Sequence, residues 1–221
     1  MLFERLLVVD DRERANAALN MALDEALLLA QAPQPVLRFY GWSRPSLSFG
    51  YFGKFADVAA EMEQRDVVRR WTGGGIVWHG EDLTYALITP ATDPVSAQGP
   101  TAIYSALHGA IRDALRVEGQ EAELATQAEP KISEACFANP VRDDVMLLGH
   151  KIAGAAQRRT RGGFLHQGSI QLPDLSVSFR ERFACGLADQ IERMEMPPRV
   201  LERSAQLATE KYGTDDWLRR C

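Results

Sequence analysis

Hydrophobic residues recur at helical spacing in several segments of the chain. In residues 15–31, "ANAALNMALDEALLLAQ", apolar side chains at i, i+3 and i+4 positions predict an amphipathic helix. Residues 101–117 predict a second helix, because Pro100 stands at its start and Gly119 lies just past its end. Three further helices are expected, all in shorter segments: after Pro173, within 197–213, and over about 55–64.

Short runs of β-branched, aromatic and aliphatic residues between these helices are typical of strands. The aromatic-rich segment 33–53 suits two strands joined at "SRPS". Other strands are expected at 67–71, 76–79, 83–89, 145–148, 151–157 and 164–172. Strands and helices follow no fixed alternation, so the pattern predicts an α/β (α+β) domain with a mixed sheet flanked by helices. Residues 1–221 carry no repeat and are expected to form a single domain.

Composition narrows the class of protein without identifying it. Apolar residues make up 46% of the chain and charged residues 25%, which is ordinary for a globular protein. The net charge of −5 argues against a nucleic-acid partner, and no apolar run approaches the ~20 residues that cross a bilayer. The N-terminus "MLFERLLVVDDRERAN" mixes charges into its apolar stretch and is therefore not a signal peptide. A cytoplasmic monomer is the expectation.

Three cysteines are too few and too widely spaced for a disulfide framework or a zinc site, so no metal is expected. Cys136 precedes a loop closed by Pro140, and a lone buried cysteine is usually a small hydrophobe. As a nucleophile it needs a neighbouring cation or base, which Lys151 supplies if the fold brings the two together. Cys185 is expected to be structural.

The segment "RRWTGGGIVWHGEDLTY", residues 69–85, is the first candidate site. Its three glycines serve either a tight hairpin or a loop whose backbone approaches a ligand, with Arg69 or Arg70 adding charge for a phosphate or carboxylate. It does not match a P-loop. His79 and Asp82 either hydrogen-bond to each other or contact a ligand, and a structural pair is favoured. By contrast, His108 lies beside a helical apolar stripe and is expected at the surface.

The second candidate site surrounds Lys151, which is followed by the small residues of "IAGAA". Small side chains let a ligand lie against the backbone, and a lysine there can hold a carboxylate or phosphate. A hairpin with Gly149 in its turn and a solvated lysine explains the glycine but not the run of small residues.

Five separated segments resemble the lipoate–protein ligase and octanoyltransferase family, whose catalytic domain is shared with biotin protein ligases. They are "RRWTGGGIVWHGEDLTY", "RFYGWSRPSLSFGYFGKF", "GHKIAGAAQRR", "FLHQGSI" and "KYGTDDWLRR", in the family's order. The resemblance implies a mixed-sheet catalytic domain related to class II aminoacyl-tRNA synthetases. By matching position, it implies an acyl cleft lined by Arg70, Thr72, Gly73, Gly74, Gly75 and His79. It also implies a functional Lys151 with Gly154 and Ala155 beside it, whereas the order His166 then Gln167 departs from many members.

The resemblance leaves the reaction open between two enzymes. An octanoyltransferase takes octanoate from acyl carrier protein through a cysteine thioester, without ATP, and passes it to a lysine of a lipoyl carrier domain or a related small carrier. A lipoate–protein ligase instead uses ATP and Mg²⁺ to make an adenylate from free lipoate or octanoate. The "CF" at 136–137, "EDLTY" and the lack of a C-terminal accessory domain resemble the transferase, with Cys136 and Lys151 as its catalytic residues. A non-catalytic acyl- or carrier-binding subunit is the third possibility.

Both enzymes need an acidic carrier protein as partner. The basic loop "QRRTRGG", residues 157–163, is therefore either a docking surface or a solvated hairpin tip.

Overall fold

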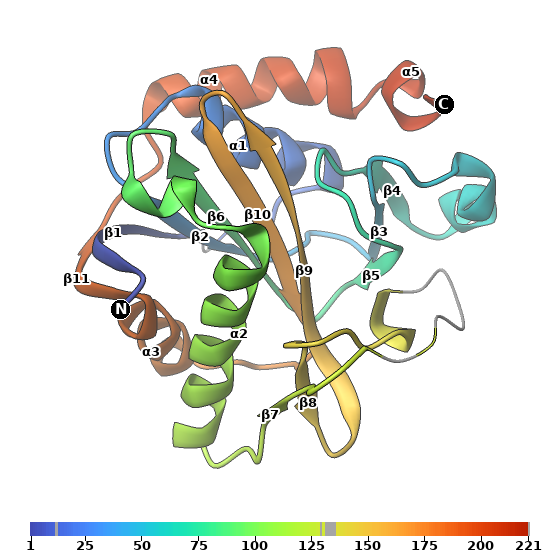
Figure 1. The fold of residues 1–221 in the computed structure, drawn as a ribbon. Helices are drawn as coiled ribbons and strands as arrows, with labels where there is room; N and C mark the ends of the chain where they lie inside the picture. The colour runs from blue at the N-terminus through green and yellow to red at the C-terminus, as the bar shows by residue number, and fades with distance from the viewer. Residues whose placement is uncertain (12, 129, 131–135, 221) are drawn as a thin grey trace.

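The computed structural model describes residues 1–11, 13–128, 130 and 136–220. An eight-stranded sheet runs through the molecule in the order β11-β1-β2-β6-β10-β9-β8-β7 (Figure 1). β1 pairs in parallel with β11 and β2, and all other neighbours are antiparallel, which confirms the mixed sheet. The strands are β1 (Phe3–Asp10), β2 (Val36–Tyr40), β6 (Leu83–Pro90), β7 (Glu123–Leu124), β8 (Val145–Leu147), β9 (His150–Thr160), β10 (Gly163–Ile170) and β11 (Ala188–Arg193).

A second, three-stranded sheet has the order β4-β3-β5, with β3 parallel to β4 and antiparallel to β5. These strands are β3 (Ser46–Phe49), β4 (Asp66–Arg69) and β5 (Val77–His79). The two strands expected in 33–53 are therefore β2 and β3, and they belong to different sheets. The glycine segment 73–75 lies between β4 and β5, at the side of the small sheet.

Helices cover both faces of the large sheet, α1 and α4 on one face and α2 and α3 on the other (Figure 1). The helices are α1 (Ala17–Leu29), α2 (Pro100–Val117), α3 (Val177–Leu187), α4 (Pro198–Leu207) and α5 (Asp215–Leu218). Short 3-10 turns occupy Phe55–Asp57 (η1), Ala59–Glu63 (η2), Pro94–Ala97 (η3) and Cys136–Ala138 (η4), and a π-helical turn, η5, follows α4 at Ala208–Tyr212.

Burial on both faces explains why the central strands are apolar at successive positions. In β2, Leu37 and Phe39 join the core under α2 and α3, whereas Val36 and Tyr40 join the core under α1 and α4. Strand side chains alternate between faces, so a strand covered by helices on both sides needs apolar residues at both parities.

α1 lies where the sequence predicts it but is not amphipathic. Residues 20–28 are all buried, because the sheet covers one side of the helix and α4 packs against another. Three of these residues are polar: Asn20, Asp24 and Glu25. Buried polar groups persist only where they are hydrogen-bonded: Arg38 donates to both Asn20 and Asp24, and Glu25 accepts from Lys211 and Tyr212.

Other expectations need correction. The helix expected over 55–64 forms as two short 3-10 turns. His108 was expected at the surface but is fully buried. Its side chain lies on the inner face of α2, where its Nδ1 donates to the carbonyl of Asp143 at 2.7 Å. β1 and β11 are strands that the pattern did not predict. Among the described residues, no helix is long and apolar enough to cross a membrane.

Candidate active site

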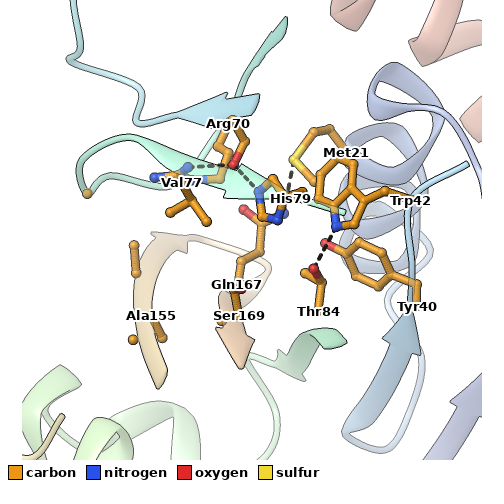
Figure 2. Close-up of a pocket in the computed structure, with 15 residues that line it drawn as sticks. Met21, Tyr40, Trp42, Arg70, Val77, His79, Thr84, Ala155, Gln167 and Ser169 are labelled. Atoms are coloured by element: carbon orange, nitrogen blue, oxygen red, sulfur yellow. Dashed lines mark hydrogen bonds between the residues drawn. The ribbon is translucent and has the colours of Figure 1, made fainter. Parts of the chain in front are cut away.

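A pocket opens between the small sheet, α1 and the strands β9 and β10 (Figure 2). The side chains of Met21, Tyr40 and Trp42 form an apolar wall, and Gly154, Ala155 and Ala156 of β9 form a second wall without bulk. Polar groups come from Ser48, Arg70, His79 and Gln167. An apolar slot with a few convergent polar groups is typical of small-molecule sites.

The glycine loop is held by the Arg70 guanidinium, which lies beneath it. Nη2 of Arg70 donates to the carbonyls of Gly73 at 3.0 Å and Gly75 at 2.8 Å. Gly74 has φ +88°, a conformation that L side chains rarely adopt. Gly50 on the neighbouring turn lies so close that an added Cβ would be 2.0 Å from the Gly74 carbonyl oxygen. The loop is therefore a constrained pocket wall as well as a chain reversal.

Arg69 does not reach the pocket, although it precedes Arg70 directly. Its guanidinium is buried and donates to carbonyls of two other segments, Tyr51 and Gly53 on one side and residues 217, 218 and 220 on the other. Of the two arginines expected to supply charge, Arg70 therefore lies at the pocket. Arg69 instead holds the C-terminal segment against β4.

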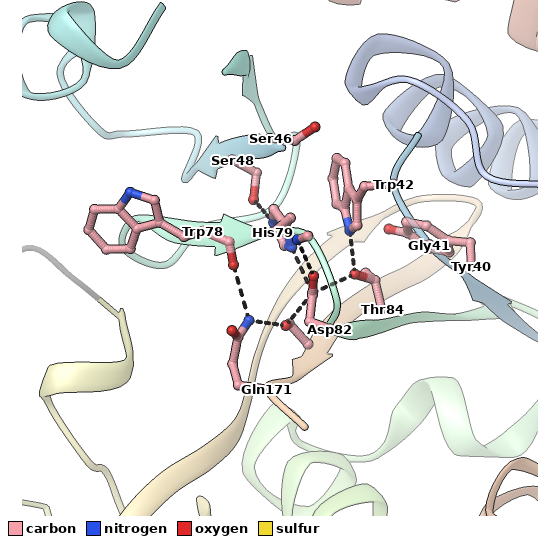
Figure 3. Close-up of polar contacts among 12 residues, drawn as sticks. Tyr40, Gly41, Trp42, Ser46, Ser48, Trp78, His79, Asp82, Thr84 and Gln171 are labelled. Atoms are coloured by element: carbon pink, nitrogen blue, oxygen red, sulfur yellow. Dashed lines mark hydrogen bonds and ion pairs between the residues drawn. The ribbon is translucent and has the colours of Figure 1, made fainter. Parts of the chain in front are cut away.

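His79 and Asp82 form the hydrogen-bonded pair that the sequence favoured. Nδ1 of His79 lies 2.8 Å from Oδ2 of Asp82, and Nε2 lies 2.6 Å from Oγ of Ser48 (Figure 3). The imidazole also stacks on Trp42, with ring centroids 3.9 Å apart. Burial lowers the pKa of His79, and the nearby Arg70 charge lowers it further against the pull of Asp82. The imidazole is therefore neutral.

Burial on its own raises the pKa of Asp82, but His79 and hydrogen bonds from Ser169 and the Gly80 amide outweigh it and hold the pKa low. Ser169 Oγ donates to Asp82 at 2.7 Å. The carboxylate is thus charged and fully engaged in the wall behind the pocket.

Thr72 is fixed by a second chain of hydrogen bonds that starts at a buried ion pair. Oγ1 of Thr72 donates to Oε1 of Gln167 at 2.7 Å, and Nε2 of Gln167 donates to Asp24 at 2.7 Å. Asp24 also pairs with the fully buried Arg38 at 2.7 Å and accepts from Tyr40 Oη at 2.9 Å. Burial raises the pKa of the Asp24 carboxyl, and Arg38 opposes that rise.

Gln167, and not His166, is the residue of the "HQ" pair that enters the pocket. Successive strand residues point to opposite faces, so His166 lies on the far side of β10, stacked on Tyr85. Burial lowers the pKa of His166 to about 3 and that of His108 to about 4.

Lys151 is buried and paired, not solvated. Its Nζ lies 2.8 Å from Oδ2 of Asp144, and the two side chains are 3% and 0% exposed. Asp144 also accepts from the Tyr104 hydroxyl and from the Val141 amide at 2.7 Å. Asp144 is a site residue that the sequence analysis missed, because its position opposite Lys151 depends on strand pairing.

A β-bulge directs the lysine side chain. Val145 pairs with Ala153 but Met146 pairs with Lys151, so Ile152 is an extra residue on β9. An extra residue shifts side-chain parity by one, and Lys151 accordingly lies over Gly154, three residues on. A Cβ on Gly154 would be 2.6 Å from Cε of Lys151. Gly154 therefore makes room for the lysine itself, a closer reason than the ligand access that the sequence suggested.

The turn η4 (Cys136–Ala138) lies beside the lysine strand. The ring of Phe137 has its centroid 5.5 Å from Nζ of Lys151. The side chain of Cys136 lies outside the described part of the molecule, as does Cys221. Cys185 is free and exposed on α3, so the expectation of a structural role is wrong.

The basic segment 157–163 forms the tip of the β9–β10 hairpin, and two of its arginines make internal contacts. Arg158 lies over the rings of Tyr51 and Trp71, at 4.8 and 4.9 Å from their centroids. Arg159 donates to the carbonyls of Ser96 and Gln98. These contacts hold the hairpin tip against neighbouring segments, and they leave the docking role as a hypothesis.

The fold is that of lipoate ligase catalytic domains. It matches a bipartite lipoate protein ligase from Thermoplasma acidophilum with a TM-score of 0.70 and 20% identity, covering 99% of this chain and 97% of the other. A lipoate-protein ligase A bound with ATP matches with a TM-score of 0.75 and 21% identity, covering 98% of both chains.

The chain belongs to the lipoyl protein ligase A/B catalytic domain family, whose profile matches residues 16–199. The resemblance stated from five sequence segments is thereby confirmed. Octanoyltransferase LipM of Anoxybacillus flavithermus is 32% identical over 269 aligned positions, covering 94% of this chain and 95% of the relative. Octanoyltransferase LipM of Bacillus subtilis is 30% identical over 265 positions, with coverage of 94% and 95%.

Proposed function

We propose that the protein is an octanoyltransferase of protein lipoylation, acting in the cytoplasm as a monomer and a single catalytic domain. It moves an octanoyl group from an acyl carrier thioester to a lysine of a lipoyl carrier domain. The similarity to octanoyltransferases over most of both chains supports the transferase over an ATP-dependent ligase or a non-catalytic subunit. The solved ligases, at about one fifth identity, share the fold alone.

One observation carries the assignment of roles within the site. Lys151, a buried cation, lies beside the turn that begins with Cys136, and Phe137 contacts its Nζ. A cation next to a cysteine favours the thiolate, which is the reactive form. The sequence predicts Cys136 as a nucleophile only if the fold brings it near Lys151. The contact between the turn Cys136–Ala138 and β9 supports that condition.

The first step transfers the acyl group to the enzyme. The Cys136 thiolate attacks the thioester carbonyl of the octanoyl carrier, a new thioester bond forms, and the carrier thiolate leaves and takes up a proton. Lys151 stabilises the negative charge on sulfur, and backbone N–H groups near the lysine strand stabilise the tetrahedral oxyanion. The apolar wall of Met21, Tyr40 and Trp42 receives the alkyl chain.

The second step releases the product. The neutral ε-amine of the carrier lysine attacks the acyl-cysteine, the amide bond forms, and the cysteine leaves as thiolate while the amine loses a proton. Because the incoming thioester is already activated, the reaction needs neither ATP nor a metal ion.

The test is intact-protein mass spectrometry after incubation with octanoyl acyl carrier protein in the absence of ATP. The expected result is a mass gain of one octanoyl group that hydroxylamine removes and that Cys136→Ser abolishes. Cys185→Ser is the matched control, because this exposed thiol lies on α3, away from the pocket. Octanoylation of a carrier from free acid only when ATP and Mg²⁺ are present would make the protein a ligase.

A further inference from the structure

Three side chains behind the glycine loop form a continuous chain of hydrogen bonds that ends at Arg70. Asp82 Oδ2 lies 2.8 Å from Nδ1 of His79, and Nε2 of the same ring lies 2.6 Å from Ser48 Oγ (Figure 3). Ser48 Oγ in turn lies 2.7 Å from Nη1 of Arg70. Ser48 is fully inaccessible to solvent, and His79 and Asp82 are buried.

The chemistry of these groups fixes which atom carries each proton. A guanidinium only donates, so Ser48 Oγ accepts from Arg70. The Asp82 carboxylate only accepts, so Nδ1 of His79 carries the ring proton and donates to Oδ2. Because the buried ring is neutral, Nε2 is unprotonated and accepts the hydroxyl proton of Ser48. Both ring nitrogens of His79 are committed within the wall.

The other end of Arg70 connects this chain to the ligand-facing loop. Its Nη2 donates to the carbonyls of Gly73 and Gly75. Ser48 on β3 thus aligns the guanidinium, and the guanidinium aligns the peptide planes of the loop. A reversal of the hydrogen-bond direction at Asp82 is therefore passed on, through this series of hydrogen bonds and Arg70, to the glycine loop.

We propose that Ser48, His79 and Asp82 are positioning residues, which act on the acyl substrate by holding Arg70 and the glycine loop in their receptive shape. His79 is then neither a general base nor a ligand donor through its ring nitrogens, although it lines the pocket. The inference rests on the proposed function only for the identity of the substrate.

Asp82→Asn tests the chain without changing its shape. Oδ1 of Asp82 accepts from the Gly80 amide, a donor that cannot rotate, whereas the donors on Oδ2 are His79 and the hydroxyls of Thr84 and Ser169. The new NH₂ group therefore takes the Oδ2 position and donates to His79 Nδ1. The ring proton moves to Nε2, where it faces Ser48 Oγ beside the Arg70 donor.

The first readout is the tautomer of His79, measured by long-range ¹H–¹⁵N NMR. The protein has only 4 histidines, so few imidazole signals need to be assigned. The wild-type protein is expected to show the Nδ1–H form and Asp82→Asn the Nε2–H form, with shifted amide signals at residues 73–75. The second readout is steady-state kinetics with octanoyl acyl carrier protein. KM is expected to rise about tenfold, the effect of weakening one charge-assisted hydrogen bond, with a smaller change in kcat.

Ser48→Ala is the second variant, in case Asp82→Asn does not fold. It cuts the chain at the other end and is expected to raise KM similarly while His79 stays in the Nδ1–H form. Ser46→Ala is the matched control on the same strand, since its hydroxyl bonds only to the carbonyl of Arg44 among the contacts described. Asp10→Asn, which removes a carboxylate paired with Arg180, controls for loss of charge.

An Nε2–H tautomer in the wild-type protein would overturn the proposal. So would a tautomer change in Asp82→Asn that leaves both the glycine amide signals and KM at wild-type values. If the wild-type protein transfers no octanoyl group, the proposed function fails, whereas the tautomer and the glycine amide signals still decide the positioning chain.

Discussion

Replacing Gly154 by alanine tests how closely Lys151 lies against its own strand. A Cβ on Gly154 would be 2.6 Å from Cε and 2.9 Å from Nζ of the lysine, and ordinary contacts begin at 3.4 Å. The Cε atom must therefore retreat by 0.8 Å, the difference between 3.4 and 2.6 Å, unless the strand shifts. Since the lysine end is flexible, the side chain is expected to give way first.

The retreat disturbs the site more than the fold. Nζ lies 2.8 Å from Asp144, so a movement of this size lengthens the ion pair and withdraws the ammonium from the Cys136 turn. A displacement of about 1 Å can lower a catalytic rate about 100-fold. We expect kcat/KM for octanoyl transfer to fall by about that factor. The off-rotamer cost of about 1 kcal/mol should lower the thermal midpoint by only about 2–4 °C.

The assay is steady-state octanoyl transfer, with thermal unfolding measured on the same samples. Gly109→Ala on α2 is the matched control, because a Cβ there meets nothing within 4 Å. It is expected to keep wild-type activity and to gain about 0.5–1 kcal/mol of stability. Wild-type kcat/KM in Gly154→Ala would refute the argument that the missing Cβ makes room for the lysine.

Two further predictions separate structural from functional charges. Arg69→Lys should lower the thermal midpoint with little change in KM for the acyl donor, because Arg69 donates to five backbone carbonyls of other segments. Arg70→Lys should instead raise that KM, because Arg70 holds the glycine loop. If both variants changed the thermal midpoint and KM equally, the separate structural and functional roles of the two arginines would be contradicted. His108 and His166 have pKa values of about 4 and about 3, below the 6.5 of a free imidazole, so the unfolded chain binds more protons as the pH falls. The contribution of these two neutral histidines to the free energy of unfolding is therefore fully present above about pH 6.5. It falls as the pH is lowered toward about pH 3, by up to about 1.4 kcal/mol per pH unit for each histidine. Urea unfolding at about pH 7 and about pH 5 measures this loss, which His166→Phe should reduce and which an unchanged slope would refute.

The sequence predicts elements well where the pattern is local. The ends of α2 agree with prediction to within a residue, because Pro100 and an apolar stripe mark it within one short segment. β1 escaped prediction because its apolar residues are mixed with charges, and one of its two parallel partners, β11, comes near the other end of the chain. α1 was misjudged as amphipathic because α4, which covers its outer side, is not adjacent in sequence.

The same limit applies within the site. The glycine segment, Lys151 and the small residues after it were singled out by residue type, and the fold brings the glycine segment and the small residues together, since a Cβ on Gly74 would be 3.4 Å from the Cβ of Ala156. Their partners Ser48, Asp144 and Gln167 were not singled out, because strand register and a bulge decide which way each side chain points. His108 was misplaced for a related reason, since only the fold shows that Tyr104 and the Asp143 carbonyl enclose it.

The structure also separates the reasons for glycine around the pocket. Gly74 needs its positive φ, Gly50 permits backbone to approach backbone, and Gly154 makes room for a lysine. Gly73 has none of these constraints, since a Cβ there meets nothing within 4 Å and its φ is not in the left-handed region. The fold therefore does not exclude a side chain at Gly73. A glycine that the fold does not require, in a loop whose carbonyls are held by Arg70, supports a ligand approaching the backbone at this point, which is the function first suspected from three glycines in a row.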